Sequence, residues 1–235
     1  MELKNILLSF HPEGWPFMAG AGVVMILLSL LGWPFFTLGA VVFAWCCYFF
    51  RDPARVTPTR PGLIVSPADG KVVAIKEATP DGDLDLGPEP RVRISIFLNI
   101  FDVHVNRMPA DGTVTTRRYR KGKFFNASLD KASVSNERMA LNLKLTGDHP
   151  QAGKLIGVVQ IAGLIARRIV CDAKEGSTFS AGERYGIIRF GSRVDIYLPP
   201  GVQPMVALGQ YMLGGETVLA DCHSNEAARQ GAKRE

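Results

Sequence analysis

Cysteine is scarce in this chain of 235 residues, and its thiols form no CxxC pair. The four are Cys46, Cys47, Cys171 and Cys222. Their number and spacing exclude a disulfide scaffold. We therefore expect reduced thiols in a protein that faces the cytoplasm. A content of 47% hydrophobic and 21% charged residues excludes a disordered or collagen-like chain, so a folded core is expected.

Charge is almost absent from the first fifty residues, and the stretch from Gly14 to Phe50 has none. A membrane-spanning helix needs about 20 apolar residues, so this stretch is too long for one span and slightly short for two. Gly32, Trp33 and Pro34 break it near the centre. We predict a hydrophobic helical hairpin in residues 1–50 that associates with membrane lipids. Aromatic residues typical of a membrane interface lie near its presumed ends, at Trp15, Trp33, Trp45 and Tyr48.

Two other interpretations of this stretch are a signal peptide and a buried helix pair of a soluble protein. A basic leading segment and a small-residue cleavage site are both missing, which disfavours the signal peptide.

Arg51, Arg55 and Arg60 follow the stretch. The positive-inside rule then predicts a cell (inner) membrane protein whose catalytic domain lies on the cytoplasmic side.

Helical periodicity is scarce after a Pro-rich linker at residues 51–62. Short apolar or alternating runs separated by turn residues predict a mainly β (α+β) domain over residues 63–223, a compact β-sandwich or barrel-like body. Residues 63–75 and 209–220 are expected to be hairpins. Residues 121–138 predict a long loop or short helix over a site, and residues 224–235 a flexible tail.

Common catalytic signatures are missing: the chain has no HExxH, GxSxG or Walker A sequence. The four histidines and their spacings suggest no metal site, and Asp81, Asp83 and Asp85 lack the glycine of a calcium loop and are expected to be solvated. The basic residues after position 50 carry no nucleic-acid-binding pattern, so an anionic membrane is the better-supported partner.

One unusual element remains, a Gly191–Ser192 pair inside an otherwise strand-like run. A glycine within a strand often marks a β-bulge. The alternative is a strained peptide whose carbonyl is attacked by its own serine hydroxyl, since glycine permits unusual backbone angles and serine supplies a nucleophile. The pair alone does not decide between the two.

Six sequence blocks in order then resemble a known family. They are FFRDPARVTP, VSPADGKVV, FDVHVNRMPADG, YRKGKFFNASLDKAS, SNER and RFGSRVDIYLP. Together they closely resemble the phosphatidylserine decarboxylase proenzymes, in particular the shorter membrane-bound branch of bacteria and archaea. The resemblance covers nearly the whole chain, from the apolar stretch to about Leu219.

The resemblance implies a self-processing lyase of phospholipid biosynthesis, which converts phosphatidylserine to phosphatidylethanolamine and CO2. Ser192 would attack the Gly191 carbonyl, and cleavage would leave a β chain of residues 1–191 and an α chain of residues 192–235 that stay associated. The covalent cofactor would be a pyruvoyl group derived from Ser192, whose keto carbonyl accepts the electrons left by CO2. No metal, no pyridoxal phosphate and no nucleic acid is implied. A homodimer is compatible with this resemblance.

Further site residues follow from the same resemblance. His104 matches the first histidine of the family's HxxH element and would deliver a proton. Arg107 stands where the longer branch has the second histidine, so a Ser-His-Asp relay is in doubt; Arg107 would instead polarise the scissile carbonyl or bind a carboxylate or phosphate. Asp69 matches the family's aspartate and would work with His104 or a water, although an Asp-Gly turn is the plainer interpretation.

Substrate recognition is less well specified by the sequence. Cations in family-like blocks would bind the lipid headgroup: Lys121, Lys123 and Arg138. Phe124 and Phe125 would line an acyl-chain entrance or pack in the core. His11, His149 and His223 match no motif and are expected to be structural or at the surface. Two alternatives stay open: decarboxylation of another serine-headgroup lipid, such as an archaeal ether lipid, and a non-catalytic membrane-tethered β-domain.

Overall fold

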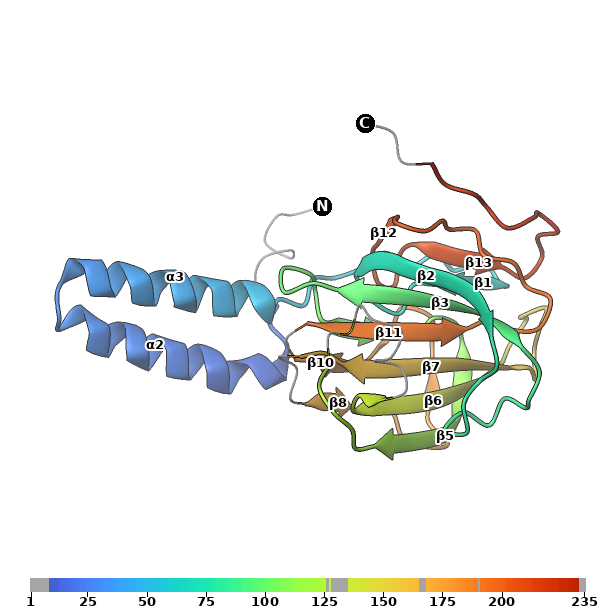
Figure 1. Ribbon diagram of the computed structural model, residues 1–235, viewed down its shortest axis with the longest axis horizontal. Coiled ribbons are helices and arrows are strands. Elements are labelled where there is room, and N and C mark those ends of the chain that lie inside the picture. The colour runs from blue at the N-terminus through green and yellow to red at the C-terminus, as the bar shows by residue number, and fades with distance from the viewer. Residues whose placement is uncertain (1–8, 126, 128–134, 165–167, 190, 233–235) are drawn as a thin grey trace. The chain divides into compact units, whose positions relative to one another are not determined.

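The computed structural model describes residues 9–125, 127, 135–164, 168–189 and 191–232 (Figure 1). The chain forms two compact units. The first holds residues 1–54 and 101–103, and the second holds residues 55–100 and 104–235.

The first unit contains the predicted helical hairpin. A short 3-10 turn, η1 (Pro12–Gly14), leads into α2 (Trp15–Ser29), and α3 (Trp33–Phe49) follows after a tight turn. Gly32 makes this turn at φ 113°, a conformation that glycine adopts without penalty. Each helix has a proline in its first turn, where the missing N–H costs nothing. The predicted break at Gly32 is therefore confirmed.

The hairpin carries apolar side chains on its exposed surface. Leu30, Leu31 and Trp33 at the turn are 79%, 65% and 78% exposed, and further exposed apolar residues follow along both helices. Among the described residues, neither helix has the length and apolarity needed to cross a membrane.

The second unit is built on an antiparallel sheet of eight strands in the order β12-β2-β3-β11-β7-β6-β5-β9 (Figure 1). Its strands are β2 (Gly70–Ala78), β3 (Arg91–Leu98), β5 (Gly112–Arg120), β6 (Arg138–Leu145), β7 (Leu155–Ala162), β9 (Thr178–Phe179), β11 (Ser192–Tyr197) and β12 (Tyr211–Met212). The sheet is open, with β12 and β9 at its edges, so the described residues form a sandwich and not a closed barrel.

Two smaller sheets cover one face of this sheet. One has the order β4-β10-β8, from β4 (Val105–Arg107), β8 (Ile169–Cys171) and β10 (Arg184–Ile188); the other pairs β1 (Leu63–Val65) with β13 (Val218–Asp221). Val194 and Ile196 of β11 share a buried cluster with Tyr185 and Ile188 of β10. We call this the inner face of the large sheet. The mainly β sandwich predicted from the sequence is confirmed.

The opposite, outer face is covered by the loop between β2 and β3. Leu84 and Leu86 of this loop pack on Val159, Ile161 and Tyr197 of the sheet. Because successive side chains of a strand alternate between faces, β11 directs Ser192 to the inner face and Arg193 to the outer one.

Both hairpins predicted in this unit are wrong in their pairing. Residues 63–75 do contain two strands, but β1 pairs with β13 and β2 with β3 and β12. In residues 209–220, β12 and β13 likewise pair elsewhere. The two turns bond to each other instead, because Gly215 N donates to Ser66 O at 2.7 Å and Ser66 N donates to Thr217 O at 2.8 Å. Turn residues predict where the chain reverses but not which strand it then joins.

Candidate active site

The Gly191–Ser192 peptide lies at the point where β11 begins. Gly191 has φ +64°, in the left-handed region, and Ser192 is the first residue of the strand. Ser192 pairs with Leu98 of β3 on one side and Ala162 of β7 on the other. The hydroxyl-bearing residue is therefore fixed in the centre of the sheet, while the preceding glycine turns sharply away from strand geometry.

His104 holds the peptide nitrogen of Gly191. The N–H of Gly191 donates to His104 Nε2 at 3.1 Å, and His104 is fully buried. Its own carbonyl accepts from the N–H of Ile188 at 3.3 Å, which ties the start of β4 to β10. To accept this bond, Nε2 must be unprotonated, so the proton of the neutral ring is on Nδ1. The structure thus brings together two residues that the sequence predicted separately.

The hydroxyl of Ser192 is buried and has no hydrogen-bond partner among the described residues. Buried polar groups are nearly always paired, so an unpaired one needs an explanation. A buried hydroxyl is screened from water, as the attack of a serine on its own peptide carbonyl would require. These residues fit the formation of a prosthetic group from Ser192 itself.

Asp69 lies in the turn before β2 and is held by a backbone N–H and an arginine. One carboxylate oxygen accepts from Gly214 N at 2.7 Å, and the other pairs with Arg55 Nη2 at 2.7 Å. Both side chains of the ion pair are less than a tenth exposed. Breaking a buried pair is costly, so these contacts give Asp69 a structural task. Its predicted partnership with His104 stays a prediction.

Arg107 is buried beside the same turn. Its backbone N–H donates to Pro67 O, and its guanidinium Nη1 donates to Gly182 O, both at 2.9 Å. A side chain at position 215 would come within 2.8 Å of Arg107 Cδ. Arg107 and Asp69 therefore share one neighbourhood, formed by the turns at 66–69 and 213–217. The predicted role of Arg107 towards a carbonyl, carboxylate or phosphate stays a prediction.

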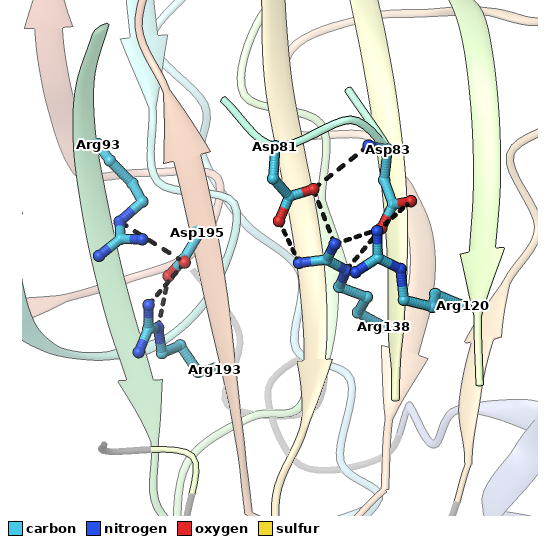
Figure 2. Close-up of polar contacts among 7 residues, drawn as sticks. All are labelled: Asp81, Asp83, Arg93, Arg120, Arg138, Arg193 and Asp195. Atoms are coloured by element: carbon cyan, nitrogen blue, oxygen red, sulfur yellow. Dashed lines mark hydrogen bonds and ion pairs between the residues drawn. The ribbon is translucent and has the colours of Figure 1, made fainter. Parts of the chain in front are cut away.

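Arg138 is placed on the other side of the sheet from Ser192. It lies with Ala140 on the outer face, where its Nε donates to Asp83 and its Nη2 to Asp81, each at 2.7 Å (Figure 2). Arg120 adds a bond to Asp83 at 2.9 Å. The structure does not bring Arg138 to the Gly–Ser peptide.

The loop containing these aspartates also differs from its prediction. Asp81 and Asp83 bind arginines of the sheet instead of being only solvated, whereas Asp85 is exposed as expected. The leucines between them fix the loop, because Leu84 and Leu86 are buried on the sheet. The alternation of aspartate and leucine in residues 81–86 is the sequence signal that could have indicated a loop packed on the sheet.

The remaining predicted substrate contacts lie in residues 121–138, of which 126 and 128–134 fall outside the described part. Lys121 and Lys123 are exposed, and Lys123 Nζ lies 5.9 Å from the centre of the Phe125 ring. Phe124 packs against the core, while Phe125 is 46% exposed. The structure thus separates the two phenylalanines into a core residue and a surface residue.

The other histidines have distinct surroundings. His149 is buried beside a cavity of about 440 Å³ at the end of the sheet that lies away from Ser192. His11 accepts a hydrogen bond from Glu13 N and caps η1, and His223 is exposed. All four cysteines are free thiols.

Sequence reasoning missed three residues that the geometry places at or near the site. Arg55 stands within a family-like block, but only the structure shows its pairing with Asp69. Asn136, in the SNER block, is fully buried. Gly163 lies directly against the Gly191 carbonyl. Their roles depend on contacts across the fold, which no local spacing reveals.

The fold and site together define a β-sandwich in which a Gly–Ser pair has a buried serine and a glycine whose N–H is bonded to a histidine. The family described as phosphatidylserine decarboxylase matches residues 42–220. A phosphatidylserine decarboxylase proenzyme of Cereibacter sphaeroides is 56% identical over 232 residues, covering 99% of this chain and 98% of the relative. One of Paramagnetospirillum magneticum is 52% identical over 231 residues, covering 98% and 94%. The chain belongs to the phosphatidylserine decarboxylase family.

Proposed function

We propose that this chain is a proenzyme that cleaves itself between Gly191 and Ser192 and then decarboxylates phosphatidylserine to phosphatidylethanolamine. The observation that carries the proposal is the buried Ser192 hydroxyl, which has no partner among the residues that the structure describes, next to a positive-φ glycine whose N–H is held by His104. Family membership and the names of the close relatives support the same activity.

Self-cleavage would proceed through an ester. The Ser192 oxygen bonds to the Gly191 carbonyl carbon, the peptide C–N bond breaks, and the hydroxyl proton passes to the released amine. Loss of the Ser192 α-proton then expels the Gly191 carboxylate and breaks the Cβ–O bond. Elimination leaves dehydroalanine at position 192. Water then hydrolyses it: the water oxygen becomes the keto oxygen, and the amine nitrogen of residue 192 leaves as ammonia. A glycine at 191 permits the backbone turn, and β3 and β7 hold Ser192 in place.

The resulting pyruvoyl group would act as the electron sink for decarboxylation. His104 has two successive tasks. Before cleavage it holds the Gly191 N–H; afterwards Gly191 is a chain end, so Nε2 can be released, take up a proton from water and deliver it to the carbon that has lost CO2. Lys121 and Lys123, which are exposed, are proposed to attract the anionic headgroup, and Arg107 to bind its carboxylate or phosphate.

The hairpin is proposed to enter the bilayer from one side and keep the chain on the membrane that holds its substrate. Its uncharged stretch and its exposed apolar side chains support this, because soluble proteins rarely expose such a continuous apolar surface. The arginines that follow favour the cytoplasmic side. The full chain should float with anionic lipid vesicles, and a Leu27→Arg, Val41→Arg double variant should float less.

The activity is tested with vesicles containing phosphatidylserine or, in a second arm, a serine-headgroup ether lipid. We expect phosphatidylethanolamine and CO2 from the first arm, and no product from Ser192→Ala. Product from the ether lipid alone would establish the alternative substrate. A wild-type chain that stays uncut and produces nothing in either arm would favour the non-catalytic alternative, which the comparisons do not support.

A further inference from the structure

The scissile carbonyl lies against the backbone of Gly163. A Cβ atom placed on Gly163 would come within 2.1 Å of the Gly191 oxygen and 3.0 Å of the Gly191 carbon. The third neighbour, Ala127 Cβ, is at 3.4 Å. The two closest atoms thus belong to the very carbonyl that Ser192 would attack.

Gly163 is required for space and not for backbone conformation. It is not among the glycines with positive φ, so alanine could adopt its backbone angles. Gly191 is the reverse case, because its φ is +64° while a Cβ there would meet nothing within 4 Å. The antiparallel register of Ser192 with Ala162 brings these two glycines opposite each other.

Asn136 fixes the backbone on which the carbonyl rests. Its Nδ2 donates to Ala162 O at 2.8 Å and to Phe125 O at 2.7 Å, and its Oδ1 accepts from Phe125 N at 2.9 Å. The N–H of Ala162 donates to Glu137 O at 2.9 Å. Ala162, the residue before Gly163, is therefore held by a backbone bond at its N–H and a side-chain bond at its carbonyl, so this segment cannot easily yield to an added methyl group.

We propose that Gly163, held by Asn136, is a positioning residue for self-cleavage, which deepens and rests on the proposed function. The bare Cα lets the Gly191 oxygen lie against the end of β7, and this sets the direction in which the carbonyl carbon faces Ser192 Oγ. Attack by a neighbouring side chain closes a small ring, so a misplacement of about 1 Å lowers the rate by roughly 10²-fold.

The test follows cleavage of the full chain after cell-free synthesis, by mass spectrometry, in wild type and Gly163→Ala. We expect cleavage of the variant to slow by roughly 10²-fold, with a melting temperature within a few degrees of the uncut Ser192→Ala chain. Hydroxylamine cleaves an ester at Gly191 and leaves serine at the new terminus. We expect hydroxylamine to release no such fragment from Gly163→Ala, because the ester does not form.

Gly157→Ala is the matched control on the same strand. Its Cβ would meet the ends of Leu86 and Leu84 at 2.8 and 2.9 Å, far from the Gly–Ser peptide, so it should strain the sheet but cleave at the wild-type rate. If Gly163→Ala does not fold, Asn136→Ala is the second test variant. It should also cleave more slowly than the wild type. Cleavage at the wild-type rate in both Gly163→Ala and Asn136→Ala would overturn this inference but not the proposed function. An ester that accumulates in Gly163→Ala and is cleaved by hydroxylamine would do the same. An uncut wild-type chain would overturn the proposed function as well.

Discussion

Ser192 and Arg193, which are neighbours on β11, differ in how their buried polar groups are paired on the two faces of the large sheet. On the outer face, Asp195 bonds to Arg193 at 2.6 and 2.7 Å and lies 3.8 Å from Arg93, while Arg138 binds two aspartates (Figure 2). On the inner face, the Ser192 hydroxyl has no partner among the described residues. Neighbouring residues of one strand thus differ: the charges of Arg193 and Asp195 are paired, whereas the Ser192 hydroxyl has no partner in the part of the chain that the structure describes, as the proposed attack on Gly191 would require.

The largest expected effect concerns the inner face. His104→Ala removes both the acceptor for the Gly191 N–H and the proton donor, so cleavage should slow and decarboxylation by any cleaved fraction should fall by about 10²–10⁴-fold. His104→Gln offers an oxygen that can accept the same N–H. It should recover cleavage but not decarboxylation, measured by mass and by CO2 release. Equal recovery of both reactions would contradict the two tasks assigned to His104.

An intermediate effect is expected on the outer face. Asp195→Ala leaves Arg193 and Arg93 without their buried counter-charge, which should lower the free energy of unfolding by about 3–5 kcal/mol in urea denaturation. Cleavage at Gly191 should still go to completion, because Ser192 points to the other face. Asp195→Asn, which keeps an acceptor oxygen, is the milder control. Loss of cleavage without loss of stability would break the distinction between the faces.

The smallest expected effect concerns the pH dependence of stability, through a second buried polar group without a partner in the described residues. His149 Nε2 is also buried without a partner in the described residues, but it lies beside the distant cavity. Burial lowers the pKa of His149, opposed by Asp111 and assisted by His223. Its stabilising contribution is therefore full above the unfolded-state pKa of about 6.5 and is lost as the pH falls through the lower folded-state pKa.

The urea midpoint should accordingly fall between about pH 7.5 and pH 5.5 by more in the wild type than in His149→Asn. The His149→Asn chain should cleave itself at the wild-type rate. His149 lies away from the Gly–Ser peptide and takes no part in the proposed attack on the Gly191 carbonyl. Identical pH profiles would show that His149 does not titrate differently on folding.

The sequence predicted local features well and contacts between distant segments poorly. The helical hairpin, its break at Gly32 and most strands followed from the missing charge, the alternation of apolar residues and the turn residues. The strand partners of β1 and β12 could not be predicted, because the turns before and after them interlock across the fold. Arg138 was expected at the substrate, but strand alternation directs it to the outer face.

The site shows the same division. Gly191, Ser192 and His104 stood out through motif resemblance, and the structure joins His104 to the Gly191 N–H. Gly163 had no local signal, and Asn136 lay within the resembling SNER block without any sign of its contacts. Their importance comes from the register of β7 with β11, which only the folded chain reveals.

The central claim is tested most directly by the intact mass of the purified chain under denaturing conditions, with Ser192→Ala beside it. We expect two wild-type fragments, residues 1–191 and residues 192–235, the smaller beginning with a pyruvoyl group in place of serine, and one uncut chain for Ser192→Ala. A wild-type chain that stays whole, or one cut with serine at the new terminus, would contradict it.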